Sequence, residues 1–98
     1  MDCNQTDICG KITKLGVLRY TPAGVAIIDF TISHVSRQVE AGVSRQVLCE
    51  IFSVALGQMA KIISEMKTDT MVKATGFLNR KSRLSQQLVL HVNHIIQI

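Results

Sequence analysis

The chain has 98 residues, of which 47% are hydrophobic and 18% charged, a composition typical of a small folded domain and not of a disordered segment. No apolar run reaches the roughly 18 residues that a transmembrane helix needs. The polar, acidic residues 1–7 are unlike a secretory signal. Three cysteines, Cys3, Cys9 and Cys49, cannot form a complete disulfide framework, so we expect a cytoplasmic protein.

The positive charge of the chain is concentrated near its C-terminal end. The formal net charge is +4, and residues 1–69 contribute none of it, because their seven acidic and seven basic residues cancel. Residues 70–98 contain Lys73, Arg80, Lys81 and Arg83 and no acidic residue. A local positive surface favours a polyanionic partner, although a solvated basic edge on an ordinary domain would give the same count.

The first strand is predicted over residues 7–20. Gly10 and Gly16 interrupt it, and glycines inside a strand often mark bends where a sheet coils. The next residues, Thr21-Pro22-Ala23-Gly24, have proline at the second and glycine at the fourth position of a type I turn. This sequence therefore predicts a hairpin between the first strand and the second.

The second strand shows a clear alternation of apolar and polar residues, which indicates one buried and one wet face. The residues predicted to face the core are Ala26, Ile28, Phe30 and Ile32, and those predicted to face water are Asp29, Thr31 and Ser33. A polar break with glycine follows at residues 40–43, and a third strand is predicted over residues 44–54.

One helix and two further strands complete the predicted fold. Apolar residues recur at helical spacing over residues 56–66, and strands are predicted over residues 70–79 and 86–96. Five strands with one helix between the third and the fourth is the layout of an all-β, Greek-key OB-fold barrel. The pattern alone also permits a ferredoxin-like or SH3-like arrangement. We expect one domain over residues 1–98, with residues 1–6 as a flexible N-terminus.

The turn and second strand also resemble a known family. Residues 18–24 (Leu-Arg-Tyr-Thr-Pro-Ala-Gly) and residues 26–34 are similar to the second-strand signature of bacterial single-stranded-DNA-binding proteins. Further features resemble the branch of this family that acts in replication restart, and the likeness extends over residues 8–97. They are His34, Glu40-Ala41-Gly42, Arg45-Gln46, Gly76-Phe77 and Val89-Leu90-His91.

The resemblance implies an OB-fold homodimer that binds single-stranded DNA without sequence preference. It also implies contacts with a PriA-like restart helicase, a DnaT-like loader protein and SSB. The chain has Val43 and Leu48 at positions where the best-known member of the family carries aromatic residues that contact bases. Stacking on an aromatic ring is worth roughly 1–3 kcal/mol per base. We therefore expect weaker DNA binding that depends on charge, or stacking supplied from elsewhere.

Two other functions stay open at this point. The chain could be a protein-interaction adaptor of the restart primosome with weak DNA affinity, since two aromatic positions are missing. An RNA-binding, cold-shock-like barrel is disfavoured, because such domains depend on surface aromatics.

The basic segment between the last two predicted strands is the main candidate binding site, since OB-folds commonly contact oligonucleotides through this loop. Arginine can pair with phosphate through two hydrogen bonds and can stack on bases, and a serine hydroxyl can donate to a phosphate oxygen. A solvated turn is the alternative, and Lys11 and Lys14 could contribute or be uninvolved. The predicted DNA-binding residues are Arg80, Lys81, Ser82 and Arg83, extended by Arg19, Arg37, Arg45 and Lys73.

The remaining candidate residues predict no chemistry. Phe52, Phe77 and Cys49 fall in apolar strands and are predicted to lie in the core. His91 and His94 are three residues apart, which places them on opposite faces of a regular strand. The acidic residues are scattered, and no phosphate-binding glycine motif occurs. We expect no enzyme activity, no catalytic residue, no metal and no cofactor.

Overall fold

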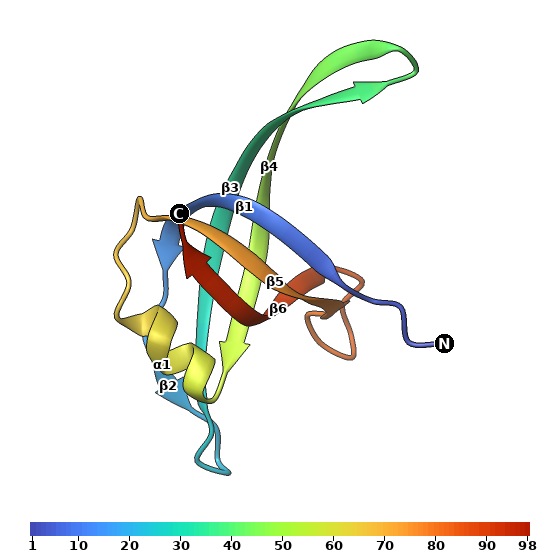
Figure 1. The fold of residues 1–98 in the computed structure, drawn as a ribbon. Coiled ribbons are helices and arrows are strands. Elements are labelled where there is room, and N and C mark those ends of the chain that lie inside the picture. The colour runs from blue at the N-terminus through green and yellow to red at the C-terminus, as the bar shows by residue number, and fades with distance from the viewer.

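The strands of the chain close into a barrel in the computed structural model, which describes residues 1–98 (Figure 1). Neighbouring strands follow the order β1-β5-β6-β4-β3-β2, and β1 also pairs with β3, which closes the barrel. One short helix lies between β4 and β5, so the predicted OB-fold is confirmed. The elements are β1 (Thr6–Leu15), β2 (Arg19–Tyr20), β3 (Ala26–Glu40), β4 (Val43–Leu56), α1 (Gln58–Ser64), β5 (Met71–Arg80) and β6 (Leu88–Gln97).

The strand β1 serves two neighbours because it bends across the barrel. Residues 6–11 pair with β5, and residues 11–15 pair with β3. At Gly10 a Cβ atom would lie 2.5 Å from the main-chain oxygen of Ser33, so the backbones approach too closely for any residue but glycine. Before the strand, the Asn4 side chain makes two hydrogen bonds with the main chain of Leu78. The flexibility expected for residues 1–6 stays a prediction.

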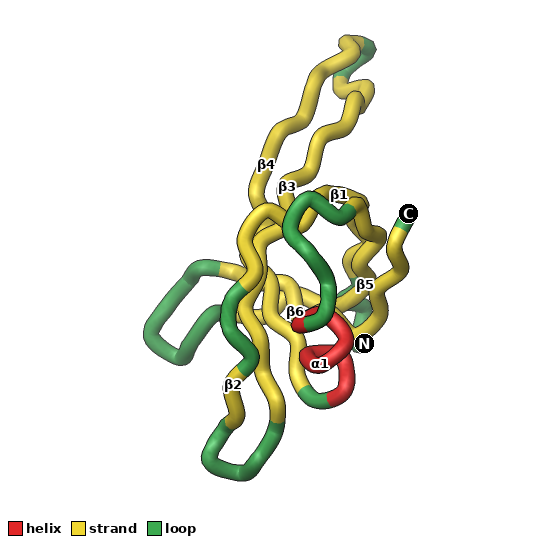
Figure 2. Tube along the Cα trace, turned by 90° about the vertical axis from the view of Figure 1, so that its left-hand side faces the viewer, coloured by secondary structure: helices red, strands yellow, loops and turns green.

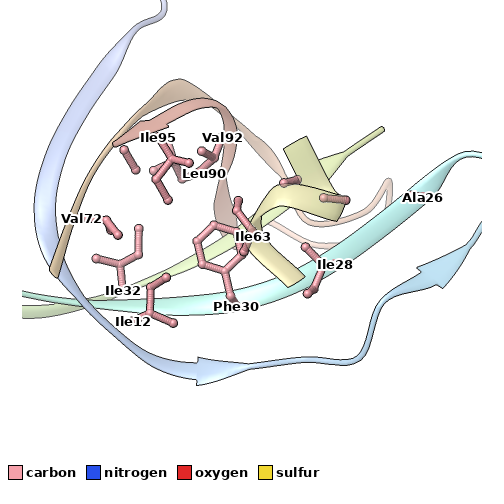
Figure 3. Close-up of a cluster of buried hydrophobic side chains, with 13 residues drawn as sticks. Ile12, Ala26, Ile28, Phe30, Ile32, Ile63, Val72, Leu90, Val92 and Ile95 are labelled. Atoms are coloured by element: carbon pink, nitrogen blue, oxygen red, sulfur yellow. The ribbon is translucent and has the colours of Figure 1, made fainter. Parts of the chain in front are cut away.

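The core fills the inside of the barrel, with Phe30 among the aliphatic side chains of several strands (Figure 3). The core-facing residues predicted on β3 are all buried, with at most 3% of their surface exposed. From α1, Ala60 and Ile63 are also fully buried in this cluster. The helix is shorter than predicted, because Leu56 still belongs to β4 and Gly57 has a positive φ of 68°. No helix of the chain has the length and apolar character required to cross a membrane.

The prediction for the turn before the second strand and the prediction for Thr31 within that strand have different outcomes. The turn before it is confirmed: the Gly24 amide donates to the Thr21 carbonyl at 2.8 Å, and the Thr21 amide donates to the Val25 carbonyl. Thr31 was predicted to face water, but only 5% of its surface is exposed. It lies between Lys14 of β1 and Phe52 of β4, its partners in the sheet, so its short side chain is flanked by two longer ones.

The hairpin of β3 and β4 is longer than predicted, and its outer half stands clear of the barrel (Figures 1 and 2). We call residues 34–49 the arm; its pairs run from His34 and Cys49 out to Glu40 and Val43. At its base, His34 Nδ1 donates to the Cys9 carbonyl at 2.7 Å. Cys49 was predicted in the core but is exposed, because it lies on this arm. Four apolar side chains of the arm are more than half exposed: Val35, Val39, Val43 and Leu48.

The tip of the arm offers a test of local strain. Ala41 and Gly42 both have positive φ, 51° and 76°, as a two-residue type I′ turn requires. Alanine is disfavoured in this conformation, whereas asparagine tolerates it. We expect Ala41→Asn to stabilise the arm by about 0.5–1 kcal/mol, measured as slower amide hydrogen exchange in residues 37–46. Unchanged exchange would contradict this account of the turn, and Ala23→Asn is the control outside the arm.

Candidate nucleic-acid interface

A groove of about 610 Å³ lies on the outer face of the barrel, across β3, β4 and β6. Three basic side chains line it, Lys14, Arg19 and Lys81, together with the rings of Phe52 and His91. The loop 81–87, which projects to the left in Figure 2, lies beside it. In OB-folds this strand face and this loop are where oligonucleotides bind.

The groove has free positive charge. Arg19 forms an ion pair with Asp29, with Nη1 2.9 Å from Oδ2. Both side chains are more than half exposed, so solvent screens the pair and either partner can exchange it for another charge at little cost. Lys14 and Lys81 take part in no ion pair in the structure. Two lysines are therefore available in the groove to bind an anion.

The loop 81–87 is closed at its base by the Lys81 amide, which donates to the Gln87 carbonyl at 2.8 Å. Within it the Ser85 amide donates to the Ser82 carbonyl at 3.3 Å, and Arg80, the last residue of β5, donates from Nη1 to the Arg83 carbonyl at 3.4 Å. All four residues predicted here are exposed: Arg80, Lys81, Ser82 and Arg83. We call these four residues the basic loop; they present three charges on a short, folded-back segment.

Two predicted arginines lie away from the groove, on the arm. Arg45 is seven residues from Phe52 along β4, which is about 23 Å in an extended strand. Its Nε lies 3.4 Å from Oε1 of Glu40, so part of its charge is neutralised. Arg37 pairs with Gln46, and Arg45 with Gln38, in the next pair along the hairpin. The two arginines therefore lie on opposite faces of the arm.

Lys73 also lies apart from the groove. It pairs with Cys9 of β1 and Ile96 of β6 and is seven residues, about 23 Å, from Arg80 along β5. The structure thus gathers the basic loop and Arg19, but not Lys73.

The carboxyl group of Asp7 has a lowered pKa, and the main cause is a hydrogen bond of 2.7 Å from the Thr75 hydroxyl. Desolvation opposes this shift, while Gln5 and the charge of Lys73 support it.

The two phenylalanines that were predicted in the core are exposed instead: Phe52 by 46% and Phe77 by 37%. On β4 the core-facing position is Ser53, so the strand alternation turns Phe52 outward. On β5 the core-facing residues are Ala74 and Gly76, which likewise turns Phe77 outward. Apolar character alone did not distinguish the two faces of these strands.

A bulge in β6 corrects the prediction for the two histidines. Thr75 pairs with His94, whereas Gly76 pairs with Val92, so Asn93 is an extra residue between them. The bulge shifts the alternation, and His91 and His94 therefore share the outer face. Their predicted separation on opposite faces is wrong, although no group of three or more His, Cys, Asp or Glu side chains gathers around them.

The Phe77 and His91 rings are stacked, with centroids 4.9 Å apart and planes 10° from parallel. Their strands are neighbours, and the two residues are partners in the sheet. Gly76, directly before Phe77, allows β5 to approach the main chain of His91, with which a Cβ atom would overlap. This packing holds the imidazole at the edge of the groove.

A closed barrel of this topology, with a basic groove on its outer face, defines an oligonucleotide-binding OB-fold. A model described as another single-strand binding protein family matches residues 4–94. The chain is 46% identical to replication restart protein PriB of Nitrosomonas europaea, over 91% of this chain and 82% of that protein. It is 34% identical to PriB of Neisseria meningitidis, over 94% and 91% of the two chains. The chain therefore belongs to this single-strand binding family, within its PriB group.

Solved structures agree with this assignment. PriB from Ralstonia solanacearum superposes with a TM-score of 0.89 at 31% identity, over 96% of both chains. The single-stranded DNA binding protein from Thermus aquaticus gives a TM-score of 0.78 at 21% identity. The superposition covers 97% of the present chain and 50% of the Thermus aquaticus protein. At 21% identity this likeness supports the fold alone.

Proposed function

We propose that this protein binds single-stranded DNA without sequence preference, as a non-enzymatic accessory protein of replication restart in the bacterial cytoplasm. The observation that carries the proposal is the groove on the OB-fold face, with Lys14, Arg19 and Lys81 next to the basic loop. The names of the PriB relatives support the role in restart.

The basic loop supplies the main contacts in this proposal. Arg80 and Arg83 each present a planar guanidinium that can bind a phosphate through two hydrogen bonds, and Lys81 reaches into the groove. Phosphate contacts fix the position of a strand but carry no information about its sequence. A site of this kind therefore binds any single strand, and its affinity depends on salt.

The salt dependence of binding tests this proposal directly. Three or four phosphate contacts in each subunit predict that log K falls against log salt with a slope of about −2 to −3 for single strands. The measurement is the fluorescence anisotropy of labelled oligo-dT, titrated with the protein at several salt concentrations. A slope near zero, or no binding at low salt, would contradict the proposed function.

We further propose that the protein is a homodimer that contacts a PriA-like restart helicase, a DnaT-like loader protein and SSB. Exposed apolar side chains at one end of β5 and β6 support a second copy: Met71, Ile96 and Ile98. Sedimentation equilibrium at micromolar concentration should give twice the chain mass. A monomer mass under these conditions would overturn the dimer.

A protein-interaction adaptor is the second candidate function, and the arm favours it. Val35, Val39 and Leu48 lie on one face of the arm and offer an apolar surface away from the groove, and exposed apolar patches of this kind often mark protein interfaces. The adaptor is supported if oligo-dT binds with a Kd well above micromolar at low salt while stimulation of the helicase is retained. Tight DNA binding would favour the first proposal instead.

A further inference from the structure

The floor of the groove has an aromatic character that the basic residues do not explain. The chain contains three phenylalanines, one tyrosine and no tryptophan. Phe30 and Phe52 both line the groove, but Phe30 is only 3% exposed, whereas Phe52 is 46% exposed. Phe52 is the partner of Thr31, which pairs on its other side with Lys14. An exposed ring and a lysine that has no ion-pair partner thus line the same groove, two strands apart.

A second ring lies on the same floor. In the parallel pairing of β4 and β6, Val54 is the partner of His91, so Phe52 is two residues away from His91 in register. Strands are about 4.8 Å apart and rise about 3.3 Å per residue, which places these two backbone positions roughly 8 Å apart. Both side chains line the groove. One planar base can therefore contact both rings.

The imidazole of His91 is already fixed from the opposite side. Its ring is stacked on Phe77 at 4.9 Å and 10°, and Phe77 does not line the groove. One face of the imidazole is thus covered by Phe77, and the remaining surface of His91 is available in the groove. A ring that is held before the ligand arrives loses little side-chain entropy on binding.

We propose that Phe52 and His91 form a stacking subsite for one unpaired nucleobase, with Phe77 as a positioning residue that holds the imidazole. The subsite rests on the proposed binding of single-stranded DNA and adds the residues that contact a base. It supplies stacking from β4 and β6, whereas Val43 and Leu48 on the arm supply none. Lys14 and Lys81 bind the phosphates on either side of the base.

The first experiment separates base contacts from phosphate contacts. Oligo-dT is compared with an oligonucleotide of equal length that carries abasic sites, so that the phosphates are the same. The wild-type protein should bind oligo-dT about tenfold more tightly, and Phe52→Leu should remove this preference while its binding of the abasic strand is unchanged. Tyr20→Leu, which removes an exposed ring outside the groove, is the control and should keep the preference.

Three outcomes of this comparison would overturn the proposed function or the proposed subsite. If the wild-type protein binds neither strand at low salt, the proposed function fails and the subsite fails with it. If the wild-type protein binds oligo-dT and Phe52→Leu binds both strands as the wild type does, DNA binding stands and the subsite is wrong. A preference that is lost in Tyr20→Leu but not in Phe52→Leu also overturns it.

A single tryptophan gives an independent readout, because the chain has none of its own. The fluorescence of Phe52→Trp should be quenched when oligo-dT binds, through stacking of the indole on a base. Ile62→Trp, on the exposed side of α1, should show no quenching at the same occupancy. Retained binding without quenching of Phe52→Trp would overturn the proposal.

The positioning role of Phe77 has its own test. Phe77→Leu should reduce the preference for oligo-dT about threefold, and Phe77→Tyr should restore it, because the ring that contacts the imidazole returns. A loss in Phe77→Leu that Phe77→Tyr does not rescue would show that the position acts on folding and not on His91. Thermal unfolding of both variants checks that they are folded.

Discussion

Replacing Arg80, Lys81 and Arg83 together by alanine is expected to weaken the binding of oligo-dT about 100-fold, at roughly 1 kcal/mol for each charged contact. The three side chains are exposed, and none contributes to the core. The loop they leave keeps its main-chain hydrogen bonds, from the Lys81 amide to Gln87 and from Ser85 to Ser82. The variant should therefore stay folded, which circular dichroism and thermal unfolding can check.

A matched variant separates the position of the charge from its amount. Alanine at Lys11, Lys61 and Lys67 removes three positive charges from exposed positions outside the groove. If the basic loop forms the site, this control should lose only a few-fold in affinity, through weaker long-range attraction. Equal losses in the two variants would show that net charge is responsible and would remove the loop as the site.

Gly76→Ala is expected to lower the free energy of unfolding by at least about 3 kcal/mol, through backbone strain. A Cβ atom at this position would overlap the main-chain oxygen of His91 and lie 2.7 Å from its carbonyl carbon. Both strands are fixed there by the buried side chains of Ala74 and Val92, so the backbones cannot separate without opening the core. Urea unfolding measures the effect as a lower midpoint at an unchanged slope.

Gly24→Ala provides the comparison for this variant. Gly24 has a φ of 82°, but nothing lies within 4 Å of the position that a Cβ would take. Alanine there incurs the conformational cost alone, about 1–2 kcal/mol. A Gly76→Ala variant that is no less stable than Gly24→Ala would mean that β5 and β6 adjust at the bulge more freely than the packing indicates.

Much of the fold could be predicted because local and tertiary requirements coincide. From Ile28 to Ile32 the strand faces a core on one side, so apolar and polar residues alternate without a break. The prolyl turn before it is defined by its own residues. The arm could not be predicted in full, because residues 34–40 have no core to face and therefore show no alternation. Its pairing depends on the turn at Ala41 and Gly42 and on main-chain bonds.

The site was less predictable than the fold. The basic loop stands out in the sequence by charge, but the groove residues Phe52 and His91 do not, because which face of a strand is covered depends on its neighbours. Ser53 between Phe52 and Val54 was misleading, because a polar residue between two apolar ones is expected to face water, whereas Ser53 occupies the core side and Phe52 the outer side. The bulge at Asn93 left no signal in composition, and only the pairing with Thr75 and Gly76 shows it.

The arm also has a hydrodynamic consequence. The molecule extends over 50 × 32 × 23 Å and has a radius of gyration of 14.4 Å, larger than the roughly 13 Å expected for a compact chain of this length. An elongated particle diffuses more slowly than a sphere of equal mass, so a single subunit elutes early in gel filtration. The number of subunits should therefore be determined by sedimentation equilibrium, which depends on mass and not on shape.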